Sequence, residues 1–302
     1  MHAVCRAVDC GGSKISSTIV VDQSNKANFR TIQAAIDSIK PNNAQWVKIQ
    51  INAGVYKEKV QIPTEKPCIF LQGQGKQVTT ITNNDHNAPN TSSTFTAFAN
   101  NLAASEITFK NSYGIIQRLN MHRNERHFGI RDPSLAARIS GDKCAFYNCN
   151  FIGFQDTVWD ERGRHYFQNC LFEGAVDFIF GAGQSFYQDC VLNATALGSI
   201  TAQGRASTSD QSGFVFEGGS VVGSGVGNSL LGRAYRSCSR VIFHKTALAP
   251  VVEPVGWDAW NYTNKISEDC KQIYAESAFS SLRLSVQDQV RTLRNVLLGR
   301  RN

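Results

Sequence analysis

The amino-acid sequence predicts an all-β solenoid, a parallel β-helix, from an internal repeat and from the composition. Cys149, Cys170 and Cys190 recur at a nearly constant interval, and an aromatic pair precedes each of them. The repeated segments are CAFYNC from Cys144, HYFQNC from His165 and SFYQDC from Ser185. A period of about 20 residues built from strand-like units is typical of solenoids, and the LxxLxL pattern of leucine-rich repeats is absent. The 24 glycines, 7 prolines and short aromatic and β-branched runs also favour a β-rich fold with many tight turns.

Helices are expected at both ends of the solenoid, because an uncovered coil would expose core residues and strand edges. Within residues 28–40, four apolar residues share one helical face: Ile32, Ala35, Ile36 and Ile39. This pattern predicts a short N-terminal capping helix. Apolar residues at roughly helical spacing over residues 282–298 predict a C-terminal helix. We therefore divide the chain into a poorly ordered N-terminal extension (1–20), a β-helix domain (21–270) and an atypical basic tail (271–302).

The composition argues against several classes of partner. The net charge is +7 over 302 residues, but the segment from Lys271 onward supplies much of it, with six basic and two acidic residues. No basic segment interleaved with stacking aromatics indicates a nucleic-acid site. No run approaches the roughly 20 apolar residues of a membrane span, and the N-terminus shows no apolar region of a signal peptide. We expect neither nucleic acid nor a membrane as a partner.

The nine cysteines are expected to act mostly as small buried residues. None has zinc-finger spacing with histidines, so no metal site is predicted. If the repeat is a β-helix, Cys149, Cys170 and Cys190 stack on successive coils. We expect these three to be packing residues that form no disulfides with one another, because neighbours on parallel strands often have poor disulfide geometry. Sequons for glycosylation begin at Asn90, Asn193 and Asn261.

Two aspartates follow the same phase as the cysteines. Asp156 and Asp177 are separated by the same interval as Cys149 and Cys170, and so are Gly153 and Gly174. The backbones of the two aspartates should therefore lie on adjacent coils, about 4.8 Å apart. Two carboxyl groups so close together cannot both ionise freely, and this arrangement suits one nucleophile or base and one acid. Spacing alone fits a pair of solvated corner aspartates equally well.

The neighbouring residues favour the chemical interpretation. Asp177 is flanked by apolar residues in VDFIFG, where a charge is costly unless it is paired. Gln155 offers an uncharged amide donor beside Asp156. Arg233 can hold a carboxylate in two-pronged geometry and keep it ionised.

The chain resembles the plant-type pectin methylesterases, or pectinesterases, of carbohydrate esterase family 8. The resemblance covers residues 28–262, and the family's motifs occur in the family's order. They are GVYKEKV from Gly54, GFQDT from Gly153, GAVDFIFG from Gly174, LGRAY from Leu231 and GWDAW from Gly256. Any one motif is weak, but the ordered set is highly specific.

The resemblance implies a right-handed parallel β-helix that needs no metal or other cofactor. Asp177 would be the nucleophile and Asp156 the general acid and then base. Gln155 would stabilise the oxyanion, and Arg233 would orient Asp177. An apolar platform for the sugar would consist of Tyr235, Trp257 and Phe178.

The family's biology follows from the same resemblance. It implies methyl-esterified homogalacturonan as the substrate, hydrolysed to pectate and methanol in cell wall modification and pectin catabolism. It also implies a secreted, monomeric glycoprotein in the cell wall, with a proteinaceous pectinesterase inhibitor as a candidate partner.

Two departures from the family pattern bear on activity. Pro133 stands where the family has a second oxyanion glutamine, and proline has no side-chain donor. Losing one such donor typically costs about 10²–10³ in rate. The sequence from Ile273 onward also departs from the family's usual C-terminal strand and loop, and Tyr235 replaces a usual tryptophan.

These departures keep alternative functions open. One is a weakened or inactive pectin-binding homologue. Another is a different pectin-degrading β-helix enzyme, a polygalacturonase or a pectate lyase. A glycosidase also uses paired acids, but a lyase would need an acidic calcium cluster, which is absent from the sequence. The Gln-Asp-Thr sequence at Asp156 favours an esterase.

Overall fold

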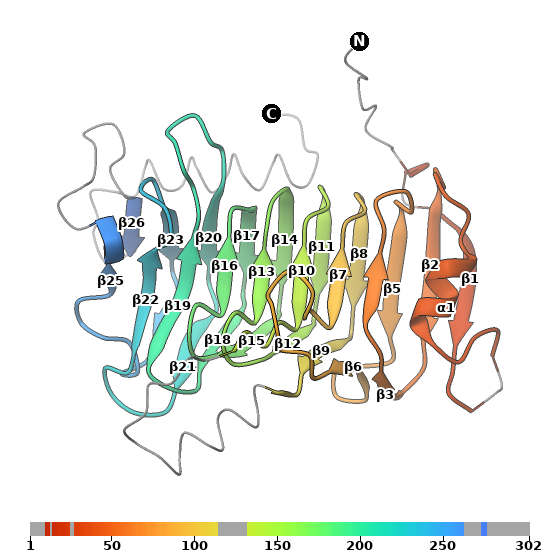
Figure 1. Cartoon of the computed structure of the whole chain (residues 1–302), viewed down its shortest axis with the longest axis horizontal. Coiled ribbons are helices and arrows are strands. Elements are labelled where there is room, and N and C mark those ends of the chain that lie inside the picture. The colour runs from red at the N-terminus through yellow and green to blue at the C-terminus, as the bar shows by residue number, and fades with distance from the viewer. Residues whose placement is uncertain (1–9, 13, 25–26, 114–131, 263–272, 277–302) are drawn as a thin grey trace.

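The computed structural model describes residues 10–12, 14–24, 27–113, 132–262 and 273–276. These residues form three parallel sheets that run along one long axis (Figure 1). The first sheet contains β1 (Ile15–Val21), β2 (Trp46–Ile51), β5 (Ile69–Gly73), β8 (Leu102–Ser105), β11 (Cys144–Tyr147), β14 (Arg164–Gln168), β17 (Gln184–Gln188), β20 (Gly213–Glu217), β23 (Arg240–His244) and β26 (Ile273–Glu276).

The second and third sheets have eight strands each. The second contains β3 (Gly54–Lys57), β6 (Thr79–Asn83), β9 (Thr108–Asn111), β12 (Asn150–Ile152), β15 (Leu171–Gly174), β18 (Val191–Ala194), β21 (Ser220–Gly223) and β24 (Ala247–Leu248). The third contains β4 (Val60–Ile62), β7 (Phe95–Ala97), β10 (Ala137–Ile139), β13 (Val158–Asp160), β16 (Ile179–Gly181), β19 (Gly198–Gln203), β22 (Ser229–Ala234) and β25 (Trp257–Asp258).

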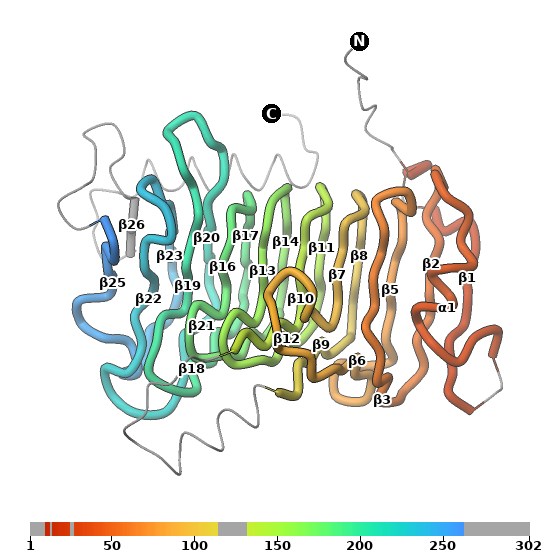
Figure 2. Tube along the Cα trace, in the orientation of Figure 1, coloured from red at the N-terminus to blue at the C-terminus, as the bar shows by residue number. Residues whose placement is uncertain are grey.

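Each coil passes from the first sheet to the second and then to the third, and the next coil stacks on it (Figure 2). For example, β11, β12 and β13 form one coil, and β14, β15 and β16 form the next one. This is the right-handed parallel β-helix that the repeat and the resemblance predict.

Aromatic residues at repeated positions stack in the interior. The rings of Phe146, Phe167 and Tyr187 lie 5.1 and 4.7 Å apart between centroids, and the column continues through Phe216 to Phe243. These side chains are almost fully buried. Burying each contributes about 1.5–3 kcal/mol, which is why a repeat of aromatic positions stabilises the solenoid.

The predicted cysteine ladder is confirmed. Cys149, Cys170 and Cys190 precede the paired strands β12, β15 and β18, and all three are buried free thiols. Other cysteines are oxidised: Cys10 forms a disulfide with Cys68, and Cys238 is also disulfide-bonded. The repeated cysteines are therefore packing residues, whereas the Cys10–Cys68 disulfide attaches the segment just before β1 to a later coil.

The predicted N-terminal capping helix is present as α1 (Ile32–Ser38). It lies at the end of the solenoid beside β1 and β2 (Figure 1). Ile32, Ala35 and Ile36 are buried, and the Thr31 side chain accepts a hydrogen bond from the Ala34 amide. The Glu58 carboxylate accepts from two further amides of the first turn. The helix thus covers core residues, and its own N-terminal donors are satisfied.

The two ends of the β-helix differ from the expected boundaries. β1 begins at Ile15, inside the expected extension, and pairs with β2. At the other end, β26 pairs with β23 and lies in the expected tail. The predicted C-terminal helix at residues 282–298 lies outside the described residues.

Candidate active site

Asp156 and Asp177 occupy equivalent positions where the second sheet passes into the third. Asp156 lies between β12 and β13, and Asp177 lies between β15 and β16. The Asp156 amide donates to the Val176 carbonyl at 3.0 Å. Both aspartates have left-handed backbone angles, with φ of 59° and 49°. Aspartate adopts this conformation more readily than most residues. The prediction that the two lie on adjacent coils is confirmed.

Arg233 of β22 holds the Asp177 carboxylate in a two-pronged ion pair. Its Nε donates to Oδ1 at 2.7 Å, and its Nη2 donates to Oδ2. β22 lies two strands from β16, and Ala202 of β19 is the residue between them in register. The small alanine leaves room for the arginine to reach across β19. Two charge-assisted hydrogen bonds favour the ionised carboxylate.

The two carboxyl groups have different electrostatic surroundings. Burial and then the charge of Asp177 raise the pKa of Asp156 from 3.8 to about 7, although Arg233 and a hydrogen bond from Gln155 oppose the shift. Burial also raises the pKa of Asp177, but there the hydrogen bonds and charge of Arg233 act directly against it. One acid is therefore suited to hold a proton near neutral pH, while the other has a cationic partner.

Gln155 and Pro133 lie on adjacent coils beside this pair. Gln155 makes a β-bridge with Val176, and its carbonyl accepts from the Ser134 amide at 2.9 Å. The Ser134 hydroxyl also accepts from the Phe154 amide at 2.8 Å. Pro133, next to Ser134, is thus one coil from Gln155 and offers no donor there.

Aromatic rings extend the site beyond Arg233. The Arg233 guanidinium lies 4.0 Å from the ring centroid of Trp260, a cation–π contact. Tyr235 is 47% exposed, and its ring lies 6.3 Å from that of Trp260. Trp257 is only partly buried and packs against the core, 6.0 Å from Phe243. Tyr235 therefore has surface for a sugar, and Trp257 has less.

Phe178 requires a correction. None of its side-chain surface is exposed, and it packs in the main core cluster. It follows Asp177 directly, but the corner turn at Asp177, where φ is 49°, is followed by two buried residues, Phe178 and Ile179, so Phe178 faces the core. A ring without accessible surface cannot contact a sugar, so Phe178 is not part of the substrate platform.

Three residues on the outer face of the third sheet were missed. Arg138, Trp159 and Phe180 are consecutive in register on β10, β13 and β16, in the row that leads through Ala202 to Arg233. The rings of Trp159 and Phe180 stack at 5.4 Å, and the Arg138 guanidinium lies 4.4 Å above Trp159. Trp159 and Phe180 are separated by the same interval as the two aspartates, so the repeat could have found them. Trp260 was visible in the GWDAW motif but received no role.

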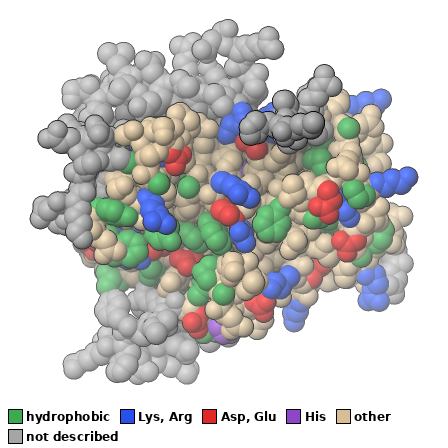
Figure 3. Space-filling model, turned by 45° about the horizontal axis from the view of Figure 1, so that its top comes forward, with side chains coloured by type: hydrophobic (Ala, Val, Ile, Leu, Met, Phe, Trp, Pro, Cys, Tyr) green, Lys and Arg blue, Asp and Glu red, His purple; other side chains and the backbone are tan. Residues whose placement is uncertain are grey.

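The surface around these rows is chemically mixed. Hydrophobic, basic and acidic side chains lie side by side on the face seen in Figure 3. Among the described residues, no group of three or more His, Cys, Asp or Glu side chains could hold a metal ion. Nor does any described helix have the length and apolar character needed to cross a membrane.

Comparisons with known proteins agree with this geometry. The family model for pectinesterases matches residues 18–278. "Probable pectinesterase 29" of Arabidopsis thaliana is 46% identical over 265 residues, covering 85% of this chain and 76% of the relative. "Probable pectinesterase 55" of the same plant is 47% identical over 251 residues, covering 81% and 74%.

Solved structures show the same architecture. The pectin methylesterase from carrot superposes with a TM-score of 0.75 at 26% identity, covering 89% of this chain and 86% of that one. Pectin methylesterase PemA from Erwinia chrysanthemi matches in fold with a TM-score of 0.70 at 20% identity, covering 92% and 97%. The family match extends over most of the chain, and the two Arabidopsis relatives share nearly half of the aligned residues with it. This chain belongs to the pectinesterase family.

Proposed function

We propose that this protein hydrolyses the methyl esters of homogalacturonan to pectate and methanol, with Asp177 as the nucleophile. The observation that carries the proposal is the unequal aspartate pair. Arg233 holds Asp177 in two hydrogen bonds, while the pKa of Asp156 on the adjacent coil is raised to about 7. Membership of the pectinesterase family supports the same reaction.

In the first half of the reaction, a carboxylate oxygen of Asp177 attacks the ester carbonyl carbon. The Gln155 side-chain amide donates a hydrogen bond to the oxyanion that forms. As the intermediate collapses, the ester C–O bond breaks and Asp156 gives its proton to the departing methoxide, which leaves as methanol. The product of this half is an anhydride between Asp177 and the galacturonate.

In the second half, Asp156 is a carboxylate and removes a proton from water. The water oxygen attacks the galacturonyl carbon of the anhydride, whose bond to Asp177 then breaks. Asp177 leaves as a carboxylate beside Arg233, galacturonic acid is released, and Asp156 has regained its proton. Arg233 thus orients the Asp177 carboxylate as the nucleophile of the first half and stabilises it as the leaving group of the second.

The substrate platform is assigned from exposed and partly exposed rings beside this chemistry. We assign Tyr235 and Trp257 to it as expected, and we add Trp260, Trp159 and Phe180 because they lie on the same face. Aromatic faces pack against the C–H groups of sugars and of a methyl ester. A pectin methylesterase of related fold has been solved with a bound hexasaccharide, which supports a sugar polymer as the ligand.

No observation favours the alternative functions. Both aspartates, Gln155 and Arg233 are in place, which argues against an inactive relic. Measuring three products from methylated pectin separates the reactions. Methanol without new reducing ends or unsaturated products is expected. New reducing ends without methanol would establish a glycosidase and overturn the proposal. Unsaturated products without methanol would establish a lyase and would overturn it too.

The setting of the reaction is also a proposal. The Cys10–Cys68 disulfide supports an oxidising compartment, consistent with the cell wall. A monomeric state and a proteinaceous inhibitor as a partner stay predictions.

A further inference from the structure

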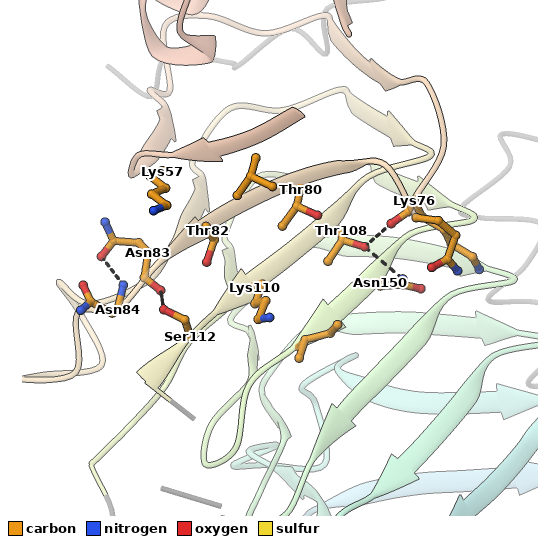
Figure 4. A pocket seen from close by; sticks show the side chains of 13 residues that line it. Lys57, Lys76, Thr80, Thr82, Asn83, Asn84, Thr108, Lys110, Ser112 and Asn150 are labelled. Carbon is orange, nitrogen blue, oxygen red and sulfur yellow. Dashed lines mark hydrogen bonds between the residues drawn. The ribbon is translucent and has the colours of Figure 1, made fainter. Parts of the chain in front are cut away.

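A groove lies on the outer face of the second sheet, away from the row of the third sheet that carries Arg233. It encloses about 610 Å³ and crosses β3, β6, β9 and β12. Four neighbouring strands span about 14 Å from first to last. We call it the lysine groove, after Lys57, Lys76 and Lys110 in its lining (Figure 4).

The lysine groove is positively charged. Its described lining contains the three lysines and no acidic residue. Lys57 and Lys110 are in one row of the register, on either side of Thr82, so their backbones lie about 10 Å apart. Among the described residues, neither ammonium group has an ion pair or hydrogen bond. Lys76 Nζ donates only a long hydrogen bond, 3.4 Å, to the Asn169 carbonyl. Two cations are thus available to an anion.

The floor of the groove is polar and ordered. The Thr108 hydroxyl donates to the Lys76 carbonyl at 2.6 Å and accepts from the Asn150 amide at 3.0 Å (Figure 4). Thr82 Oγ1 has no partner among the described residues, although it is buried. The apolar residues of the lining are Val55 and Ile152. Hydroxyls, amides and short apolar patches suit the hydroxyls and C–H faces of a sugar.

The groove ends close to the proposed active site. In register, the row of Lys57 and Lys110 continues to Ile152 of β12 and then to Glu173 of β15. Glu173 would repel a polyanion, so the favourable charge ends at β12. Ile152 is four residues before Asp156 in the same coil, and four residues of extended chain span at most about 14 Å. A polymer in the groove would therefore lie near the corner where esters are hydrolysed.

We propose that the lysine groove binds a demethylated, carboxylate-bearing segment of galacturonan, distinct from the ester that reacts at Asp177. The inference rests on the proposed function, because such segments are that reaction's product. Every demethylated residue carries a carboxylate that a lysine can pair with, whereas a methylated residue carries none. The described lining contains no aromatic side chain on which a nucleic-acid base could stack, which disfavours single-stranded nucleic acid.

The test measures binding of a fully demethylated galacturonate oligomer by calorimetry. This probe contains no ester, so binding does not depend on turnover. Lys57→Gln with Lys110→Gln should raise Kd about tenfold and reduce its salt dependence, because two charge pairs are lost. Lys14→Gln with Lys40→Gln is the matched control. Both lysines are exposed and lie outside the groove, and their substitution removes the same two positive charges. Its Kd should stay within about twofold of that of the unmodified protein.

Two further measurements complete the test. Methanol release from a short methylated oligomer should be unchanged in the groove variant, which shows that it is folded and that Asp177 still works. Polyglutamate should lose less affinity than galacturonate between the control and groove variants, since it offers carboxylates but no sugar hydroxyls for the polar floor.

Equal Kd values for the galacturonate oligomer in the groove and control variants would overturn the inference. Equal losses for polyglutamate and galacturonate in the groove variant would also overturn it, because the groove would then be a general anion surface. Failure of the proposed function would look different: the unmodified protein would release no methanol, whatever the oligomer binding.

Discussion

Asp156 and Asp160 lie four residues apart in one coil, yet their surroundings are opposite. Asp156 lies in the corner turn and has Asp177 as a like-charged neighbour, and its pKa is raised to about 7. Asp160 ends β13 and has no exposed surface. His165 Nδ1 lies 2.5 Å from its Oδ1, and the Tyr187 hydroxyl donates to its Oδ2 at 2.6 Å. The carboxyl group of Asp156 thus faces a like charge, whereas both carboxylate oxygens of Asp160 have hydrogen-bond partners.

Asp160 belongs to a closed network. Burial alone would lower the pKa of His165, but the charge and hydrogen bond of Asp160 raise it above 6.5. The other ring nitrogen lies 2.8 Å from the Gly141 carbonyl. A Cβ atom on Gly183 would come within 1.9 Å of Asp160 Oδ1, so only glycine fits there. A buried carboxylate whose hydrogen-bond partners are all present has a structural role. A carboxyl group beside a second carboxylate has a shifted pKa and is suited to catalysis.

The largest expected effect is on catalysis at Asp177. Asp177→Asn keeps the size of the side chain but removes the nucleophilic carboxylate, so kcat for methanol release should fall by at least about 10⁴-fold. The matched control is Asp189→Asn, since Asp189 is an exposed corner aspartate with φ of 51°. It should leave kcat within about twofold. Methanol release by Asp177→Asn at a near-normal rate would remove Asp177 from the mechanism.

The next effect is on stability at Asp160. Asp160→Asn leaves the fully buried His165 without its counter-charge, which should lower the free energy of unfolding by about 3–5 kcal/mol. Urea denaturation measures this change. At low temperature, the folded variant should keep kcat within a few-fold of the unmodified protein. If stability were unchanged and kcat collapsed, Asp160 would be part of the catalytic machinery and the contrast with Asp156 would fail.

A pH-dependent effect should distinguish Asp156. Its folded pKa, about 7, lies above the usual 3.8, so between these values the folded state binds more protons than the unfolded state. Stability from this group is therefore full below about pH 4 and lost as pH rises towards 7. Asp156→Asn cannot lose a proton, so its stability relative to the unmodified protein should rise by up to about 4 kcal/mol across this window. A difference that stays constant with pH would contradict the raised pKa.

The repeat made much of this predictable. In a solenoid, equal spacing in sequence becomes contact between coils, so Asp156, Asp177 and the cysteine ladder followed from their separations. Arg233 did not follow from spacing, because it reaches Asp177 across a whole strand through the room that Ala202 leaves. Its role came from the resemblance. Phe178 was misassigned because its place next to Asp177 in the sequence was taken as a place in the site, whereas its side chain is buried in the core.

The lysine groove could not be predicted from the sequence, because no constant repeat relates its residues. Its residues lie on coils of unequal length. Thr80 pairs in register with Thr108, and Thr108 pairs with Asn150, yet the second separation along the chain is much longer than the first. Without a constant period, no spacing in the sequence indicates that Lys57 and Lys110 belong to one row.

The smallest effect concerns Pro133, which lies one coil from Gln155. The Ser134 amide and hydroxyl already bind the Gln155 carbonyl and the Phe154 amide, so the backbone of this segment is fixed independently of the side chain at 133. A glutamine at this position would add a side-chain donor where proline has none. The oxyanion would then have two side-chain donors in place of one.

Pro133→Gln should raise kcat about tenfold with little change in KM, because the new hydrogen bond would form only as negative charge develops on the ester oxygen. Pro133→Ala is the control: it frees the backbone that proline restrains but supplies no donor, so any gain it shows belongs to the backbone. Thermal unfolding of both variants checks that they are folded. A glutamine variant no faster than the alanine variant would mean that another group already satisfies the oxyanion. In that case Gln155 would not be the sole donor to the oxyanion. The hydrogen-bond donors around the Asp156–Asp177 pair would then be as complete as those around Asp160.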